Sequence, residues 1–225
     1  MLSRPTVAAL FLAAAITGAP AAQTTIGGVP VDLPPPTGFC ELSDLNPSDQ
    51  QMITTLSGLL EKSGNKLLAM SADCQQLTDW RTGRRQLLDD YAQYQTIIAG
   101  MDKPPSESVA QTCATLHAQG DKILADQLPD IKARVESTLK QIKINQTNFL
   151  GVVAEEPGAC YAALVQRIRT EAGVDKTQVT IFAVTIVKNR TVLFYRFAVY
   201  QDSGTLTDVL AKIKTDIAAL AAANR

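Results

Sequence analysis

The sequence predicts an α+β fold, a mainly antiparallel sheet with helices packed on both of its faces. Strand-like segments alternate with helix-like segments early in the chain and gather into two hairpins later. The later strands are apolar on both faces, since Phe182 and Val184 alternate with Ile181 and Ala183. Both faces of the sheet are therefore expected to be covered, which makes the fold an α/β/α sandwich.

The first 21 residues have the features of a removable export signal. Arg4 precedes an apolar run over residues 6–16, and Ala19-Pro20-Ala21 matches the small-x-small pattern of a signal-peptidase site. The run is shorter than the ~20 apolar residues of a membrane-spanning helix, and no later segment approaches that length. We expect residues 1–21 to be cleaved and the mature chain to be periplasmic or secreted, without a transmembrane segment.

Residues 22–36 are rich in glycine and proline, and Pro34-Pro35-Pro36 favours an extended path. This segment is predicted to be an extended tether, which could include a short edge strand at residues 29–33. The remaining residues, 37–225, are predicted to form a single domain, because their number is enough for one substantial core.

The first predicted helix is capped by Asn46 and begins at Pro47, and Gly64-Asn65 supplies its stop. A strand, a short helix and a second strand follow, over residues 66–72, 75–81 and 88–99. The longest helical stretch starts at Ser106 and extends its apolar face to Ile142. Gly120 and Pro129 interrupt this stretch, so the pattern predicts either two helices or one bent helix.

Four strands are predicted in two hairpins, over residues 147–154 and 159–169, then 179–187 and 191–200. The second hairpin turns at Lys188-Asn189-Arg190, where Asn189 tolerates a positive φ. An amphipathic helix from Thr205 closes the chain.

The even number of cysteines predicts two disulfides in an exported chain: Cys40, Cys74, Cys113 and Cys160. Shorter loops close more readily, which favours Cys40 with Cys74 and Cys113 with Cys160, although the other two pairings stay open. No two cysteines have C-x-x-C spacing and His117 is the only histidine, so neither a metal site nor a cofactor is predicted.

Short motifs at the ends of the elements, Gly38-Phe39-Cys40, Ala72-Asp73-Cys74, Ala159-Cys160-Tyr161 and Ala223-Asn224, occur in an order that resembles uncharacterised exported proteins of alphaproteobacteria. The final third also resembles the α/β/α sandwich of PsbP-like and DcrB-like proteins in its order of elements. That fold serves photosystem assembly, envelope-associated binding and a nuclear transport factor, so the resemblance implies an accessory or binding role rather than catalysis. It assigns no function to any residue.

Residues suited to catalysis do not form a recognisable set in the sequence. The motif G-x-S-x-G, the Walker loop and G-x-G-x-x-G do not occur. His117 is expected at the solvent margin of its helix, and the pairs Asp89-Asp90 and Glu155-Glu156 should diverge because adjacent strand residues point to opposite faces. We therefore predict no catalytic residue.

Two groups of residues are candidates for binding. Trp80, Arg81, Arg84 and Arg85 cluster around Gly83 and are the candidate interaction surface for an anionic partner, unless the segment is an ordinary exposed loop. Aromatic residues of the last hairpin could line a groove for an apolar ligand or pack the core: Phe182, Phe194, Tyr195, Phe197 and Tyr200.

The formal net charge of −1 gives no general attraction to nucleic acid or anionic lipid. Together with the export signal, these observations predict a non-enzymatic accessory or protein-interaction module of the bacterial cell envelope, with an envelope protein as partner. The alternative is a periplasmic module that binds a small ligand or a lipid in a pocket between the sheet and the helices. A hydrolase of unrecognised type is a third hypothesis.

Overall fold

The computed structural model describes residues 22–139, 142–171 and 173–225, and the predicted export signal lies outside them. Its strands are β1 (Ala22–Ile26), β2 (Val29–Leu33), β3 (Phe39–Glu41), β4 (Asn65–Asp73), β5 (Tyr91–Ile97), β6 (Ile142–Glu156), β7 (Ala159–Thr170), β8 (Asp175–Val187) and β9 (Arg190–Val199). Its helices are α1 (Pro47–Glu61), α2 (Cys74–Arg81), α3 (Val109–Thr138) and α4 (Thr205–Ala223). Strands β3 to β9 form one antiparallel sheet in the order β3-β4-β5-β9-β8-β7-β6.

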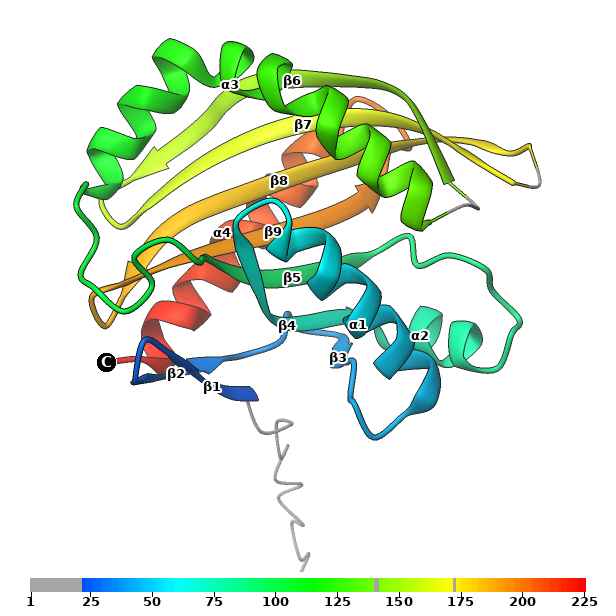
Figure 1. Ribbon diagram of the computed structural model, residues 1–225, viewed down its shortest axis with the longest axis horizontal. Helices are drawn as coiled ribbons and strands as arrows, with labels where there is room; N and C mark the ends of the chain where they lie inside the picture. The colour runs from blue at the N-terminus through cyan, green and yellow to red at the C-terminus, as the bar shows by residue number, and fades with distance from the viewer. Residues whose placement is uncertain (1–21, 140–141, 172) are drawn as a thin grey trace, which may run out of the picture.

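Helices cover both faces of this sheet, which confirms the predicted fold class (Figure 1). On one face, α3 packs along β6 and β7 and α1 packs along β4; we call it the α3 face. On the opposite face, α4 lies across β8 and β9, and we call it the α4 face. No helix in the described ranges is long and apolar enough to cross a membrane.

The segment predicted to be a tether is instead part of the fold. Strands β1 and β2 pair as a hairpin, and Ile26, Val31 and Leu33 are at most 1% exposed in the core beneath α4. Asn224, at the end of α4, donates from Nδ2 to the Asp32 carbonyl at 2.7 Å and accepts from the Asp32 N–H at 3.0 Å. The glycines and prolines shape the turn and its flanks, while the alternating apolar residues dock the hairpin.

The other elements follow the predicted order with shifted boundaries. Asn46 caps α1 by accepting from the N–H groups of Ser48 and Asp49. The longest helix is a single element that bends over the sheet (Figure 1), and it ends before Ile142, which begins β6 instead. In the last hairpin the turn residues Lys188 and Asn189 have φ values of 46° and 59°, the left-handed region that a two-residue hairpin turn requires.

Both favoured disulfides are present in the structure. Cys40–Cys74 joins β3 to the start of α2, and Cys113–Cys160 joins α3 to β7. The two bridges fit an oxidising compartment outside the cytosol. Each of them fastens a helix to the sheet.

Candidate ligand-binding site

The centre of the α3 face carries regular rows of side chains across β5, β9 and β8. One row is Tyr91–Phe197–Thr180, the next is Gln93–Tyr195–Phe182, and the third is Gln95–Leu193–Val184. The rows follow from antiparallel pairing, because residues that are directly opposite point to the same side of the sheet. Toward the hairpin turn between β8 and β9 the aromatic rings give way to the aliphatic Leu193 and Val184, while β5 contributes a glutamine to both the second and the third row.

Four aromatic rings follow one another across these rows. Tyr91 stacks on Phe197 with ring centroids 4.2 Å apart, Phe197 lies 6.2 Å from Tyr195, and Tyr195 lies 5.5 Å from Phe182. All four side chains are only half-buried. Burial raises the pKa of Tyr195 to about 12, and burial opposed by a hydrogen bond with Gln178 raises that of Tyr91 to about 12, so both are neutral at physiological pH.

A cleft of about 430 Å³ opens where Leu193 and Val184 of the third row meet the start of α3. Its floor is Phe182, Val184 and Leu193, one wall is Thr112 and Leu116 of α3, and the other wall is the loop from Ile97 to Glu107, including Met101 and Pro104-Pro105. Its volume lies in the range of roughly 300–1,000 Å³ that small-molecule sites occupy. The lining is mostly apolar, so an apolar ligand would remove surface from water here.

Local structure fixes the walls of this cleft. Cys113, one residue after Thr112, is bonded to Cys160, and Cys160 pairs with Val184 on the floor. The disulfide therefore sets the distance between the helical wall and the floor. Ser108 and Gln111 form a capping box that defines where α3 begins.

The loop wall is supported from behind by the N-terminal hairpin. Arg190 donates from Nε to the Ile26 carbonyl at 3.2 Å and from Nη2 to the Gly27 carbonyl at 3.3 Å. Gly27 has a φ of 52°, and a Cβ there would lie 2.3 Å from the Met101 carbonyl oxygen, so only glycine permits this contact. The hairpin between β1 and β2 thus holds the Met101 region of the loop in place.

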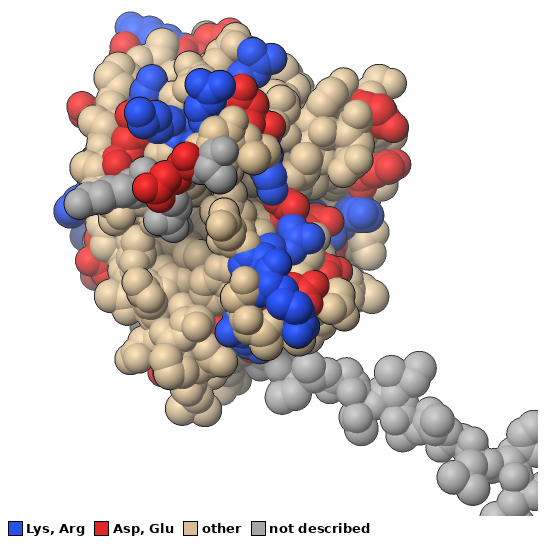
Figure 2. Space-filling model, turned by 90° about the vertical axis from the view of Figure 1, so that its right-hand side faces the viewer, with Lys and Arg blue, Asp and Glu red and all other residues tan. Residues whose placement is uncertain are grey.

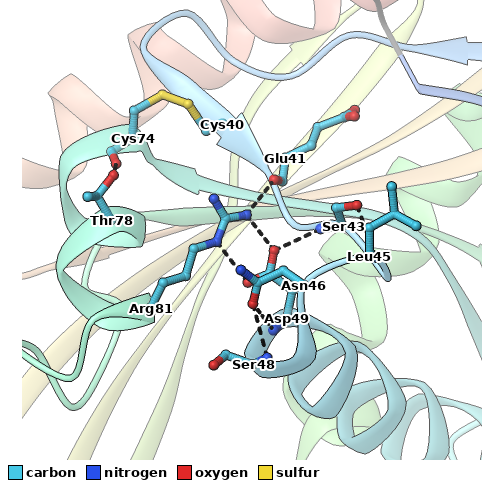
Figure 3. Close-up of polar contacts among 10 residues, drawn as sticks. All are labelled: Cys40, Glu41, Ser43, Leu45, Asn46, Ser48, Asp49, Cys74, Thr78 and Arg81. Carbon is cyan, nitrogen blue, oxygen red and sulfur yellow. Dashed lines mark hydrogen bonds and ion pairs between the residues drawn. A yellow bond between two sulfur atoms is a disulfide. The ribbon is translucent and has the colours of Figure 1, made fainter.

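The predicted interaction surface contains an arginine that is tied inward. The guanidinium of Arg81 donates to both carboxylate oxygens of Asp49, whose side chain is 0% exposed, and to the Glu41 carbonyl (Figure 3). Asp49 also accepts from the Ser43 N–H at 2.9 Å, and its hydrogen bonding raises the pKa of Arg81. Arg81 therefore joins α2 to the start of α1, and Trp80 packs half-buried on the small core around Leu77.

The two remaining arginines of this surface are paired with carboxylates. Arg84 binds Asp79 at 2.8 Å, and Arg85 binds Asp89 at 2.6 Å, where Lys176 also binds at 2.6 Å. Figure 2 shows basic side chains that adjoin one another on this side of the molecule and are bordered by acidic ones. A protein partner at this surface stays a prediction.

The acidic pairs that the sequence singled out diverge, as expected. Glu155 pairs with His117 at 2.7 Å on the α3 face, whereas Glu156 pairs with Lys214 of α4 at 3.0 Å. Asp89 holds Arg85 and Lys176, while the half-buried Asp90 lies near Arg196 and Lys212. In the part of the chain that the structure describes, no three potential metal ligands gather.

The aromatic residues of the last hairpin divide between the two faces. Phe182, Tyr195 and Phe197 lie on the open α3 face, whereas Phe194 is fully buried beneath α4. Tyr200 is 44% exposed and follows directly after β9. Neither Tyr91 nor the loop wall was predicted to belong to a site, although Pro104-Pro105 next to charged residues marks that loop as exposed.

No protein-family model matches the chain, and no curated protein matches its sequence. Among solved structures, the chain is similar to the Ran-binding protein Mog1p of Saccharomyces cerevisiae, with 9% identity and a TM-score of 0.33. The alignment covers 91% of this chain and 93% of that one. The resemblance to exported alphaproteobacterial proteins stays a prediction.

Proposed function

We propose that this chain is a non-enzymatic binding module of the bacterial periplasm that holds a small apolar ligand in the cleft beside α3. The cleft itself carries the proposal, because it combines an apolar floor, two walls fixed by a disulfide and a docked hairpin, and a volume suited to a small molecule. The proposal adopts the pocket between sheet and helices rather than the arginine surface. The reason is that carboxylates already engage all three arginines of that surface.

The charges around the cleft favour binding over catalysis. Lys103 and Glu107 are its charged lining residues, and both lie on the loop wall rather than against the floor. A general acid or base has to reach a bound substrate within hydrogen-bonding distance. On the floor a ligand is surrounded by hydrocarbon and threonine hydroxyls, so a general acid or base could act only on the part of the ligand that lies at the rim.

Binding of an apolar fluorophore tests this proposal. The mature protein is titrated into N-phenyl-1-naphthylamine, whose emission rises in an apolar site. Thr112→Trp fills the cleft from its helical wall and should weaken binding about tenfold. Ala114→Trp is the matched control, because Ala114 is exposed on the same helix and does not line the cleft.

Circular dichroism and thermal unfolding of both variants establish that they are folded. Retention of binding by Ala114→Trp together with its loss in Thr112→Trp supports the proposal. An unchanged emission with wild-type protein, or equal binding by both variants, overturns it.

A further inference from the structure

Two opposite charges at the rim of the cleft have no ionic partner in the described ranges 22–139, 142–171 and 173–225. Lys103 and Glu107 are exposed and line the same cleft, yet neither appears in any of the ion pairs there. Asp89, Lys176 and Lys214, by comparison, do have such partners. The two rim charges are therefore available to a ligand.

Neighbouring residues fix the backbone at both rim charges. The N–H of Lys103 donates to the Gly100 carbonyl at 3.0 Å and closes a turn, and Ser108 caps α3 directly after Glu107. Between them lie Pro104 and Pro105, whose rings restrict φ to about −65°. The cleft thus presents one cation and one anion on the same wall.

The surface next to these charges is apolar. Leu116, Val184 and Leu193 lie below the rim, and Ile97 and Ile186 extend the apolar surface outward at 42% and 36% exposure. Ile186 pairs with Thr191, which also lines the cleft, so it continues the face that bears Val184. A ligand that matches the site has an apolar chain below and both signs of charge at its head.

We infer that the ligand of this cleft is a single-chain zwitterionic amphiphile, with its anionic group at Lys103 and its cationic group at Glu107. The inference rests on the proposed function and adds the chemical class of the ligand. A purely anionic head group would meet repulsion from Glu107, and a purely cationic one would meet it from Lys103. An uncharged head group would gain from neither.

Competition between amphiphiles with the same dodecyl chain tests this inference. Dodecylphosphocholine, dodecanoate, dodecyltrimethylammonium and dodecyl maltoside are each used below the concentration at which they form micelles. Each displaces N-phenyl-1-naphthylamine from the mature protein at low ionic strength. Dodecylphosphocholine should compete at concentrations about fivefold below the others, since each exposed charge contact contributes modestly. Added salt should reduce this difference.

Single-charge variants assign the two contacts. Lys103→Gln should weaken the binding of dodecylphosphocholine and strengthen that of dodecyltrimethylammonium. Glu107→Gln should also weaken the binding of dodecylphosphocholine, but it should strengthen that of dodecanoate. Asp121→Asn and Lys122→Gln are the controls, because these exposed residues lie on α3 outside the cleft lining. They should leave the order of the competitors unchanged.

The outcomes separate the two proposals. If the fluorophore binds and all head groups compete equally, or dodecanoate alone competes best, the zwitterion inference is overturned and the apolar site remains. Displacement by free leucine as strong as that by dodecylphosphocholine would also overturn it, because the zwitterion would then need no long chain. Failure of the fluorophore to bind wild-type protein removes the proposed function itself.

Discussion

The two faces of the sheet are filled in different ways. Beneath α4, the side chains of Phe194, Ile181 and Ile213 are 0% exposed, and the β1–β2 hairpin closes the layer. On the α3 face, helices α3 and α1 lie over the flanking strands, and the central strands keep a cleft and four half-buried aromatic rings. The α4 face is therefore the more completely closed layer, and the α3 face keeps apolar surface that a ligand can cover.

The difference shows how a sheet can be apolar on both sides and still carry a site. A surface that a helix covers and a surface that a ligand covers both consist mostly of apolar side chains, so the α3 face is apolar in either case. Packing is complete only where a helix crosses the central strands, as α4 does. A helix placed over the edge leaves the centre as a floor.

Truncation of one phenylalanine on each face gives the largest contrast. Phe194→Ala should lower the free energy of unfolding by about 3–5 kcal/mol, because it opens a cavity in a closed layer. Phe182→Ala should cost less than half of that, since this ring is half-exposed in the cleft. Urea unfolding at constant m-value measures both, and equal losses would contradict the contrast between the faces.

Removal of the disulfide on the α3 face should have the next largest effect. The free energy of unfolding of the double variant Cys113→Ala, Cys160→Ala should be about 2–4 kcal/mol lower, because the bridge joins residues that are 47 positions apart in the chain. Hydrogen exchange should then accelerate in α3 and remain slow in α4, whose attachment is apolar. Equal acceleration of hydrogen exchange in both helices would show that the two faces do not differ in local stability.

The ion pairs near α2 differ in burial, as the two faces of the sheet do. Arg81→Met should cost about 1–3 kcal/mol, because it leaves the fully buried Asp49 carboxylate without its cation. Arg84→Met should cost at most about 1 kcal/mol, because that side chain is 61% exposed. Thermal unfolding of the two variants provides the comparison, and a larger loss for Arg84→Met would refute it.

The smallest effect depends on pH and concerns Asp90, at the border of the α4 face. Burial raises the pKa of Asp90, while nearby Arg196 and Lys212 lower it and Asp73 and Asp89 raise it. A carboxyl with a higher pKa in the folded chain stabilises the fold below its ordinary pKa and loses that contribution as the pH rises through the folded value. Asp90→Asn should therefore raise the unfolding midpoint at neutral pH, and the gain should vanish below the ordinary pKa of 3.8.

Asp79 is the matched control with the opposite sign. Hydrogen bonds from Arg84 and Gln75 lower its pKa, so its ionised form stabilises the fold above its ordinary pKa. Asp79→Asn should lower the unfolding midpoint at neutral pH, and this loss should disappear in acid. Shifts of the same sign for Asp79→Asn and Asp90→Asn would rule out this assignment.

Part of the candidate site was predictable from sequence, and part was not. The pocket between sheet and helices was one of the expected alternatives, and three of its neighbouring aromatic residues were among the candidates: Phe182, Tyr195 and Phe197. The sequence could not separate them from Phe194, since alternation shows only that neighbours point to opposite faces. Nothing in the sequence indicated that Lys103 and Glu107 line the same cleft as Leu193, which lies far away in the chain.

The sequence by itself determined the features that depend on neighbouring residues. These include the Asn46 cap, the positive φ at Asn189 and the order of strands and helices from α1 onward, while the pairing of the cysteines was only favoured by their shorter loops. Only the tertiary structure decided that residues 22–33 dock beneath α4 and that α3 leaves the central strands open. Backbone preferences act over a few residues, whereas the choice of which apolar surface covers which depends on packing between segments far apart in the chain.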